Sequence, residues 1–253
     1  MSETTKTLPV LSILQKAYAH LSNNEKKLRP FWLINLAFCA LFNAISNGFS
    51  NPLSLIVCVF YYIFWCVFFR FYYQKKPYFE GHKILASAIP SSKMMFITFA
   101  LLLFLLFVPF LPLLLGFDNT YLPFFEKYMS LLQSPATDMV NVGIFSLIFL
   151  SISPFAFSRP FLAWISALQG YNSLMRKVFQ KTRGNNVQFF KLMFLLQVPC
   201  FLVFCADNRL ECQGWLSACF YSVYLIYFNL VFAKVYDFFY DVKSYGEDAN
   251  KAF

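Results

Sequence analysis

The sequence is poor in charged residues and in histidine. Only 13% of its 253 residues are charged and two are histidine, whereas 59% are hydrophobic and 21% are aromatic. An average soluble domain has about 25% charged residues, so this chain has too few polar groups to cover a globule in water. The composition argues against a soluble domain and predicts that lipid is the solvent for much of the chain.

Motifs that carry catalysis or hold a metal are also lacking. Neither His20 nor His82 stands beside a cluster of Cys, Asp or Glu residues with ligand spacing, so we expect no metal site and no cofactor. The sequence contains no G-x-S-x-G, no H-E-x-x-H and no phosphate-binding glycine loop. Since no set of catalytic residues stands out, we expect a protein that is not an enzyme.

Long apolar segments dominate the chain instead. A bilayer core of about 30 Å needs about 20 apolar residues per helix, and segments near this length predict an all-α, polytopic transmembrane bundle of about six spans. Short amphipathic interfacial helices are expected on its cytoplasmic side. The membrane domain, 31–233, would hold spans at 31–46, 53–69, 94–116, 139–157 or 146–168, 189–206 and 215–233. Both ranges for the fourth span stay open, and the longer one places Arg159 inside the membrane.

The two ends of the chain are more polar. Residues 1–30 are expected to form a cytoplasmic amphipathic segment, because Leu11, Leu14, Ala17 and Leu21 recur at near-helical spacing. The first span would then be entered through Pro30. Residues 234–253 are expected to form a cytoplasmic tail.

Lysine and arginine alternate with the predicted spans. Six spans place 19 of the 21 Lys and Arg residues on the side of the N-terminus, and leave Lys127 and Arg209 on the other. Because this bias sets the orientation of membrane proteins, both termini should be cytoplasmic. The net charge of +9 fits attraction to anionic headgroups better than nucleic acid, so we expect membrane lipids as partners, with another membrane protein as a further candidate, and no nucleic acid.

The segment from Arg159 to Lys191 combines apolar and basic residues. Read as one helix, it has an apolar side formed by Phe161, Trp164, Leu168, Tyr171, Met175 and Val178. Its opposite side holds Ser166, Gln169, Ser173, Arg176, Lys177 and Gln180. This pattern predicts an amphipathic helix beside the membrane. The residues expected to contact lipid or a partner are Arg159, Trp164, Arg176, Lys177, Lys181 and Arg183.

Uncharged polar residues and cysteines are scattered through the spans. Asn35, Asn43, Asn141, Gln197 and Asn229 are interpreted as interhelical hydrogen-bonding groups rather than a substrate lining. Cys205 and Cys212 fall near the non-cytoplasmic face, where an oxidising compartment would permit a disulfide.

One family resemblance follows from residues 160–190. The order of a proline-broken apolar span, PFLAWISALQG, a basic stretch and a further apolar span is similar to YciC-like bacterial inner-membrane proteins. The likeness lies in KPYFEGHKILASAIPSSK and in Gly170, Ser173, Arg176, Lys177, Arg183, Gly184 and Asn185. It implies a six-helix bundle of the bacterial inner membrane, assigns no activity and favours the longer fourth span. The high Phe and Tyr content and the connector at 117–138 depart from the family pattern.

Two functions remain open on the sequence. The favoured hypothesis is a non-catalytic bundle that binds anionic lipid or a partner protein through basic cytoplasmic helices. The alternative is a transporter or lipid-moving protein with a path between helical hairpins, in which Arg159 would bind an anion and Pro109, Pro112, Pro154 and Pro199 would break the helices. The depth of Arg159 separates the two hypotheses.

Overall fold

The computed structural model describes residues 6–44, 52–88, 157–169, 175–210, 212 and 214–240. Within these ranges every helix or strand assigned is a helix, which confirms the all-α class. The helices are α1 (Val10–Asn23), α2 (Glu25–Ala44), α3 (Pro52–Tyr72), α8 (Arg159–Leu168), α9 (Met175–Lys181), α10 (Asn186–Arg209) and α11 (Trp215–Tyr240). The spans expected at 94–116 and 139–157 lie outside the described residues.

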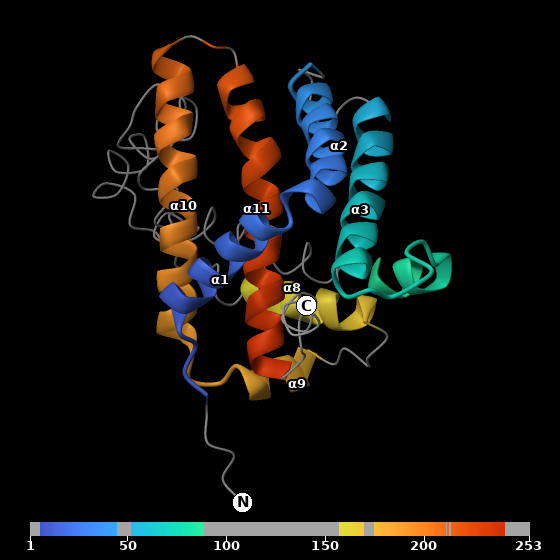
Figure 1. The fold of residues 1–253 in the computed structure, drawn as a ribbon, viewed down its shortest axis with the longest axis vertical. Helices are drawn as coiled ribbons and strands as arrows, with labels where there is room; N and C mark the ends of the chain where they lie inside the picture. The colour runs from blue at the N-terminus through green and yellow to red at the C-terminus, as the bar shows by residue number, and fades with distance from the viewer. Residues whose placement is uncertain are drawn as a thin grey trace, which may run out of the picture.

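Two antiparallel helical hairpins, α2 with α3 and α10 with α11, stand side by side (Figure 1). The end of α2 and the start of α3 lie at the same end of the molecule as the end of α10 and the start of α11. Gly214, in the α10–α11 turn, has a φ of +83° and approaches Asn43 so closely that an added Cβ would lie 2.3 Å from the Asn43 Oδ1. Both the left-handed backbone and this contact require glycine at position 214.

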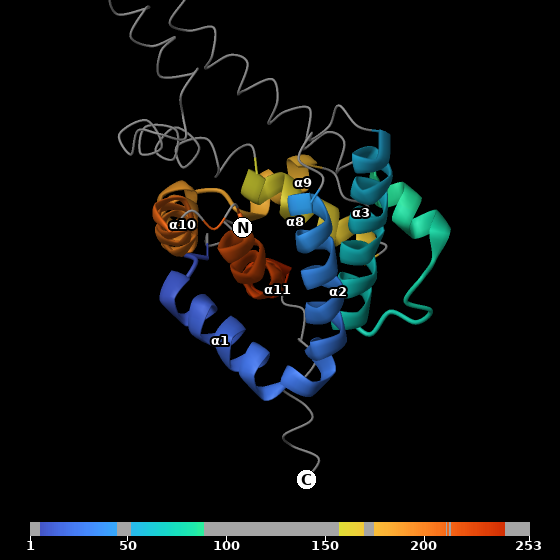
Figure 2. The same ribbon diagram turned by 90° about the horizontal axis from the view of Figure 1, so that it is seen from above.

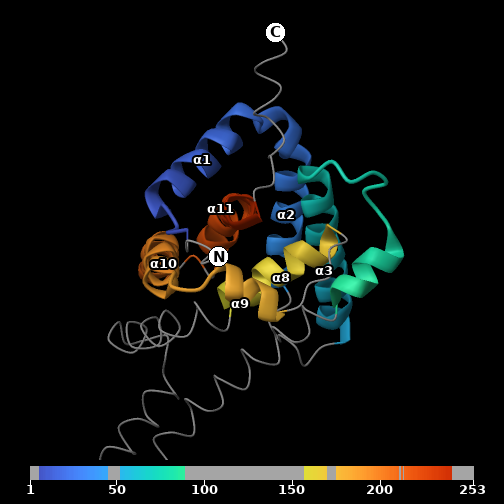
Figure 3. The same ribbon diagram turned by 90° about the horizontal axis from the view of Figure 1, so that it is seen from below.

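Helix α11 is the centre of the described fold. It contacts α1, α2, α8 and α10, and Figures 2 and 3 show it enclosed by α1, α2 and α10. Its residues from Asn229 to Tyr236 are buried without interruption. A helix buried on all sides must be apolar nearly all round, which explains the run LVFA before Lys234.

Helix α1 crosses from α10 to α2 and covers α11 (Figure 2). Val10, Ile13 and Ala17 are its buried residues, and Leu14 and Leu21 pack against the same core. Leu11, which shares their spacing in the sequence, is 68% exposed. The amphipathic pattern of this segment therefore serves packing onto the bundle.

Helix α2 extends on the N-terminal side of the expected span 31–46. It starts at Glu25 and continues through Pro30, rather than starting after this proline. Pro30 lies inside the helix, in its second turn, so one backbone hydrogen bond of α2 is missing there. α2 therefore begins in the polar segment and continues directly into the first apolar run.

Two described helices are long and apolar enough to cross a membrane: Asn186–Asp207 in α10 and Trp215–Tyr240 in α11. A shorter apolar stretch occupies Ile56–Tyr72 in α3. Only 24% of the most apolar window of α10 is buried, unlike the core helix of a soluble protein. Its exposed apolar residues are Val187, Phe190, Phe194, Leu195, Val198 and Leu202, and such a stripe is typical of contact with a membrane or with another protein.

The predicted single amphipathic helix after Arg159 is wrong as a continuous element. Helix α8 ends at Leu168, and α9 begins at Met175. Helix α8 is buried on nearly every side, including Ser166, which was expected on the polar side. Tertiary packing, which the spacing of apolar residues alone does not show, encloses α8 between α3, α9 and α11.

Candidate anion-binding surface

Arg159 lies in the protein interior. Its side chain is 3% exposed, and its Nε donates a hydrogen bond to Thr182 Oγ1 at 2.8 Å. A second nitrogen donates to Asn186 Oδ1 at 2.5 Å, and the guanidinium lies 4.9 Å from the centre of the Phe179 ring. These contacts join the start of α8 to the α9–α10 connection, and Arg159 acts there as a structural residue.

Trp164 is also buried, with 5% of its surface exposed. Its ring packs against Phe69 with 5.3 Å between centroids, and against Phe161 at 5.1 Å. Its described contacts therefore lie within the core formed by α3 and α8. Of the six residues expected to contact lipid or a partner, Arg159 and Trp164 face inward.

The other four predicted contact residues, Arg176, Lys177, Lys181 and Arg183, are exposed. Helix α9 is anchored by Val178, which is 1% exposed, and is followed by Thr182, which is fully buried. Thr182 Oγ1 donates to the carbonyl of Val178 at 2.8 Å. The buried pair fixes one side of this segment and leaves its cations outside. We call Arg176, Lys177, Lys181 and Arg183 the α9 basic cluster.

The α9 basic cluster is continuous with the N-terminal strap, residues 6–9. The backbone N–H of Leu8 donates to Asn185 Oδ1 at 2.8 Å, and Asn185 Nδ2 donates to the carbonyl of Lys6 at 2.9 Å. Gly184, with a φ of +80°, permits the tight turn between α9 and α10. Asn185, which is 2% exposed, therefore ties the strap to the start of α10.

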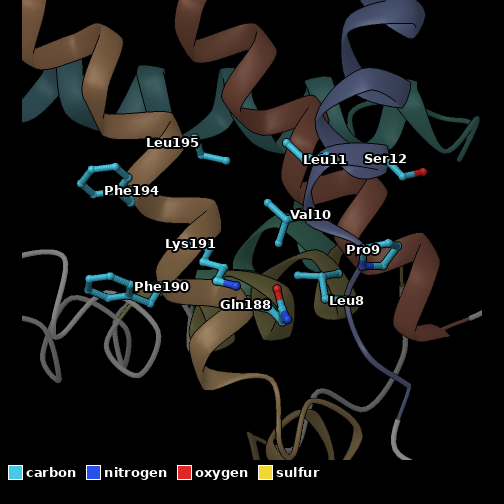
Figure 4. Close-up of a pocket in the computed structure, with 10 residues that line it drawn as sticks. All are labelled: Leu8, Pro9, Val10, Leu11, Ser12, Gln188, Phe190, Lys191, Phe194 and Leu195. Atoms are coloured by element: carbon cyan, nitrogen blue, oxygen red, sulfur yellow. The ribbon is translucent and has the colours of Figure 1, made fainter.

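A pocket of about 610 Å³ lies between this strap, the start of α1 and α10. Figure 4 shows Lys191 and Gln188 beside Leu8, with Leu11 and Leu195 further along the same space. The pocket thus combines one cation and one amide with mostly apolar walls. This combination suits an amphiphile with an anionic group and a hydrocarbon chain.

Positive charge is concentrated at the open ends of the two hairpins. In α2, α3, α10 and α11, the Lys and Arg residues lie in the half of each helix away from the turn, with Arg209 as the exception in the described residues. The set away from the turns is Lys26, Lys27, Arg29, Arg70, Lys191 and Lys234. The structure therefore brings the cations of both hairpins to one end of the fold.

Cys205 and Cys212 are free thiols in the structure, so the disulfide that their spacing would permit is not formed. The turn near them is organised by Asp207 instead. Its carboxylate accepts the backbone N–H groups of Gly214, at 3.2 Å, and of Ser217, at 3.0 Å. These bonds satisfy donors at the start of α11. The sequence signal for this role is an acid shortly before a glycine, a pattern too common to be specific.

Arg70 is a further residue whose role the sequence did not show. It is 1% exposed. It donates to the carbonyls of Pro77 at 2.7 Å and Tyr78 at 3.1 Å, and it forms an ion pair with Glu80 at 2.5 Å. A hydrogen bond with Lys83, together with Arg70, lowers the pKa of Glu80. Arg70 thereby folds the segment after α3 back onto the helix end.

Among the described residues, no group of three or more His, Cys, Asp or Glu side chains is arranged to hold a metal ion. Comparisons with protein-family models, with curated proteins and with solved structures gave no match. The resemblance to YciC-like proteins accordingly stays a prediction. The class defined so far is an all-helical protein that has, among its described residues, two helices long and apolar enough to cross a membrane.

Proposed function

We propose that the protein is an integral membrane bundle of about six spans that binds anionic lipid through its basic cytoplasmic helices, without catalysis. The observation that carries the proposal is the order of charge and apolar surface from α9 into α10. The exposed α9 basic cluster directly precedes the exposed apolar stripe that begins at Val187 and Phe190. Cations beside an apolar stripe match the boundary between headgroups and hydrocarbon.

Electrostatics favour anionic headgroups at this surface. Each Lys or Arg close to an anionic membrane surface contributes about 1 kcal/mol, so a cluster of four contributes roughly 4 kcal/mol before screening by salt. In this arrangement both termini and the open ends of the hairpins face the cytoplasm, and a bacterial inner membrane is the proposed location. A partner membrane protein with an acidic juxtamembrane face would use the same cations.

Transport receives less support than lipid binding. The alternative depended on Arg159 as a wet, anion-binding charge, but its guanidinium is held by Thr182 and Asn186 in the interior. An anion entering here would have to compete with Thr182 and Asn186 for the N–H donors of the guanidinium. We therefore assign Arg159 to folding and leave transport out of the proposal.

Photocrosslinking tests the lipid-binding proposal directly. A benzophenone amino acid replaces Lys177 in the full chain, which is placed in nanodiscs of phosphatidylcholine with one fifth phosphatidylglycerol. Phosphatidylglycerol should be captured at several times its mole fraction. The matched control places the probe at Leu202, which is 61% exposed on the apolar stripe, and there capture should follow the lipid composition.

The charge dependence of the capture provides the second arm. Replacing Arg176, Lys181 and Arg183 with glutamine should return capture at position 177 to the mole fraction of each lipid. With Arg176, Lys181 and Arg183 in place, capture of the two lipids in proportion to their mole fractions would overturn the proposal. The probe could instead capture the same acidic membrane protein reproducibly in native membranes and show no phosphatidylglycerol enrichment in nanodiscs. The ligand of the cluster would then be a protein rather than a lipid.

A further inference from the structure

A second pocket, of about 770 Å³, lies where the start of α2 meets the end of α3. Figure 1 shows these two helix ends beside each other, away from the hairpin turns. The lining residues relevant to its chemistry are Lys26, Lys27, Lys76, Gln74, Phe71 and Tyr78. Three cations and no carboxylate line this pocket, so its charge complements an anion.

Gln74 has an unusual backbone conformation for its residue type. Its φ is +53°, in the left-handed region that glycine adopts most easily. The Gln74 N–H donates to the carbonyl of Phe71 at 3.0 Å, and the Lys75 N–H donates to that of Arg70 at 2.9 Å. This pair of bonds is the Schellman ending of a helix, in which glycine is the usual residue at the position of Gln74. A glutamine here costs about 1 kcal/mol and places an amide in the pocket lining.

The wall opposite the lysines of α2 is held in place before any ligand binds. Arg70 fixes the carbonyls of Pro77 and Tyr78, and the ring of Tyr78 packs edge-on against Phe71 at 5.5 Å. A preorganised wall loses little entropy when a ligand binds. Lys76, next to Pro77, is exposed and adds a positive charge to the lining of this pocket.

We propose that this pocket binds the phosphate headgroup of an anionic phospholipid. Lys26 and Lys76 would neutralise the phosphate, the Gln74 amide would bond to phosphate or glycerol oxygens, and Phe71 and Tyr78 would contact the glycerol and the first acyl carbons. The apolar stretch of α3 ends at Tyr72, which places the pocket at headgroup depth. This inference rests on the proposed function, because it requires a bilayer around α3, and it adds a specific site to the general attraction of the α9 basic cluster.

The test uses native mass spectrometry of the full chain in detergent, titrated with phosphatidylglycerol. The variant Lys26→Gln/Lys76→Gln should weaken the tightest binding step about tenfold or more, from the loss of two cations. The control Lys16→Gln/Lys75→Gln removes the same charge from two exposed lysines outside the pocket lining and should change this step less than twofold. Equal weakening by both variants would overturn the headgroup pocket.

Gln74→Gly separates binding from folding. Glycine relieves the left-handed strain, so the thermal midpoint should stay equal or rise, while phosphatidylglycerol binding should weaken several-fold through loss of the amide. A variant that folds better and binds equally well would remove Gln74 from the site and overturn the proposed recognition. Because Gln74→Gly keeps all three lysines of the pocket, a loss of lipid binding would not come from weaker nonspecific electrostatic attraction.

Two further arms identify the source of the phosphate and separate the two proposals. Soluble glycerol 3-phosphate at millimolar concentration should compete weakly, and competition as strong as that of the lipid would overturn the assignment to a membrane lipid. If the pocket variants leave the tightest step unchanged while position 177 still enriches phosphatidylglycerol, the pocket is wrong and the α9 surface stands. If neither mass spectrometry nor crosslinking at position 177 shows a preference for phosphatidylglycerol, the proposed function fails together with the pocket.

Discussion

At the scale of single residues, buried polar side chains determine how the hairpins register against each other. Asn35 is fully buried, its Nδ2 donates to the carbonyl of Ser222 at 2.7 Å, and its Oδ1 accepts from the Tyr61 hydroxyl at 3.0 Å. One residue of α2 therefore connects α3 and α11. Trp32 adds a hydrogen bond to Ser222 Oγ at 3.1 Å, one turn earlier on α2.

We expect Asn35→Leu to destabilise the protein by about 1–2 kcal/mol, because it leaves the Ser222 carbonyl and the Tyr61 hydroxyl without this partner. Tyr61→Phe should cost less, since only one bond is lost. The double variant should cost less than the sum of the two, with a coupling of about 0.5–1.5 kcal/mol. Thermal unfolding in a single detergent measures all three, and strict additivity would show that the Tyr61 bond contributes nothing.

His20 gives the fold a predictable dependence on pH. Burial, with smaller effects of the positive charges of Lys234 and Lys27, lowers its pKa to about 4. Between this value and the unfolded pKa of about 6.5, the unfolded chain binds a proton that the folded chain does not. Stability should therefore fall as pH decreases through this window, by roughly 1–2 kcal/mol after allowance for partial exposure.

The measurement compares thermal midpoints at pH 7 and pH 4.5. His20→Phe keeps a ring beside Tyr72, whose ring centre lies 5.2 Å from that of His20, and should reduce the pH effect. His82→Gln is the matched control, because the His82 side chain is 74% exposed, and should leave the effect in place. An unchanged slope in His20→Phe would assign the pH dependence to other groups.

At the scale of helices, the sequence predicted the positions of the long apolar helices better than the helices of the polar and amphipathic segments next to them. The expected ranges 53–69, 189–206 and 215–233 fall within α3, α10 and α11, because an apolar run of this length has few other ways to satisfy its backbone. Helix α2 extends on the N-terminal side of the expected span, to Glu25, and the continuous helix after Arg159 was wrong. Periodicity reports which side of a helix is apolar, whereas α8 is buried on nearly every side.

The end of α3 offers a test of one such element. Arg70→Ala would leave the carbonyls of Pro77 and Tyr78 and the Glu80 carboxylate without this cation, and should destabilise the protein by about 3 kcal/mol. Arg70→Lys should recover only part of this loss, because an ammonium cannot reproduce the planar fork. Limited proteolysis should cut within 74–80 faster in both variants.

The control for Arg70 is Glu80→Gln, which keeps a hydrogen-bond acceptor and the backbone contacts of Arg70. It should show cleavage close to that of the unaltered protein. If Glu80→Gln were cut as rapidly as Arg70→Ala, the ion pair rather than the backbone contacts would hold the segment.

At the scale of the whole molecule, the distribution of cations predicts sidedness. In a version with the other cysteines replaced, Cys212, beside the α10–α11 turn, should react with an impermeant maleimide only from the outer face. Lys75→Cys, following α3, should react only from the cytoplasmic face. Reaction of both positions from the same face would contradict the proposed arrangement of the hairpins, in which Asn43 near the end of α2 lies beside Gly214.

The amino-acid sequence by itself determined the helical class and the separation of charge, because apolar length and Lys and Arg placement act locally along the chain. It also placed four of the six predicted contact residues on an exposed surface. Only the tertiary structure decided that Arg159 and Arg70 are interior hydrogen-bond donors and that Gln74, Lys26 and Lys76 line one pocket. These roles depend on which segments meet in space. Arg159 and Asn186, for example, belong to different helices, and nothing in the sequence between them indicates that they come into contact.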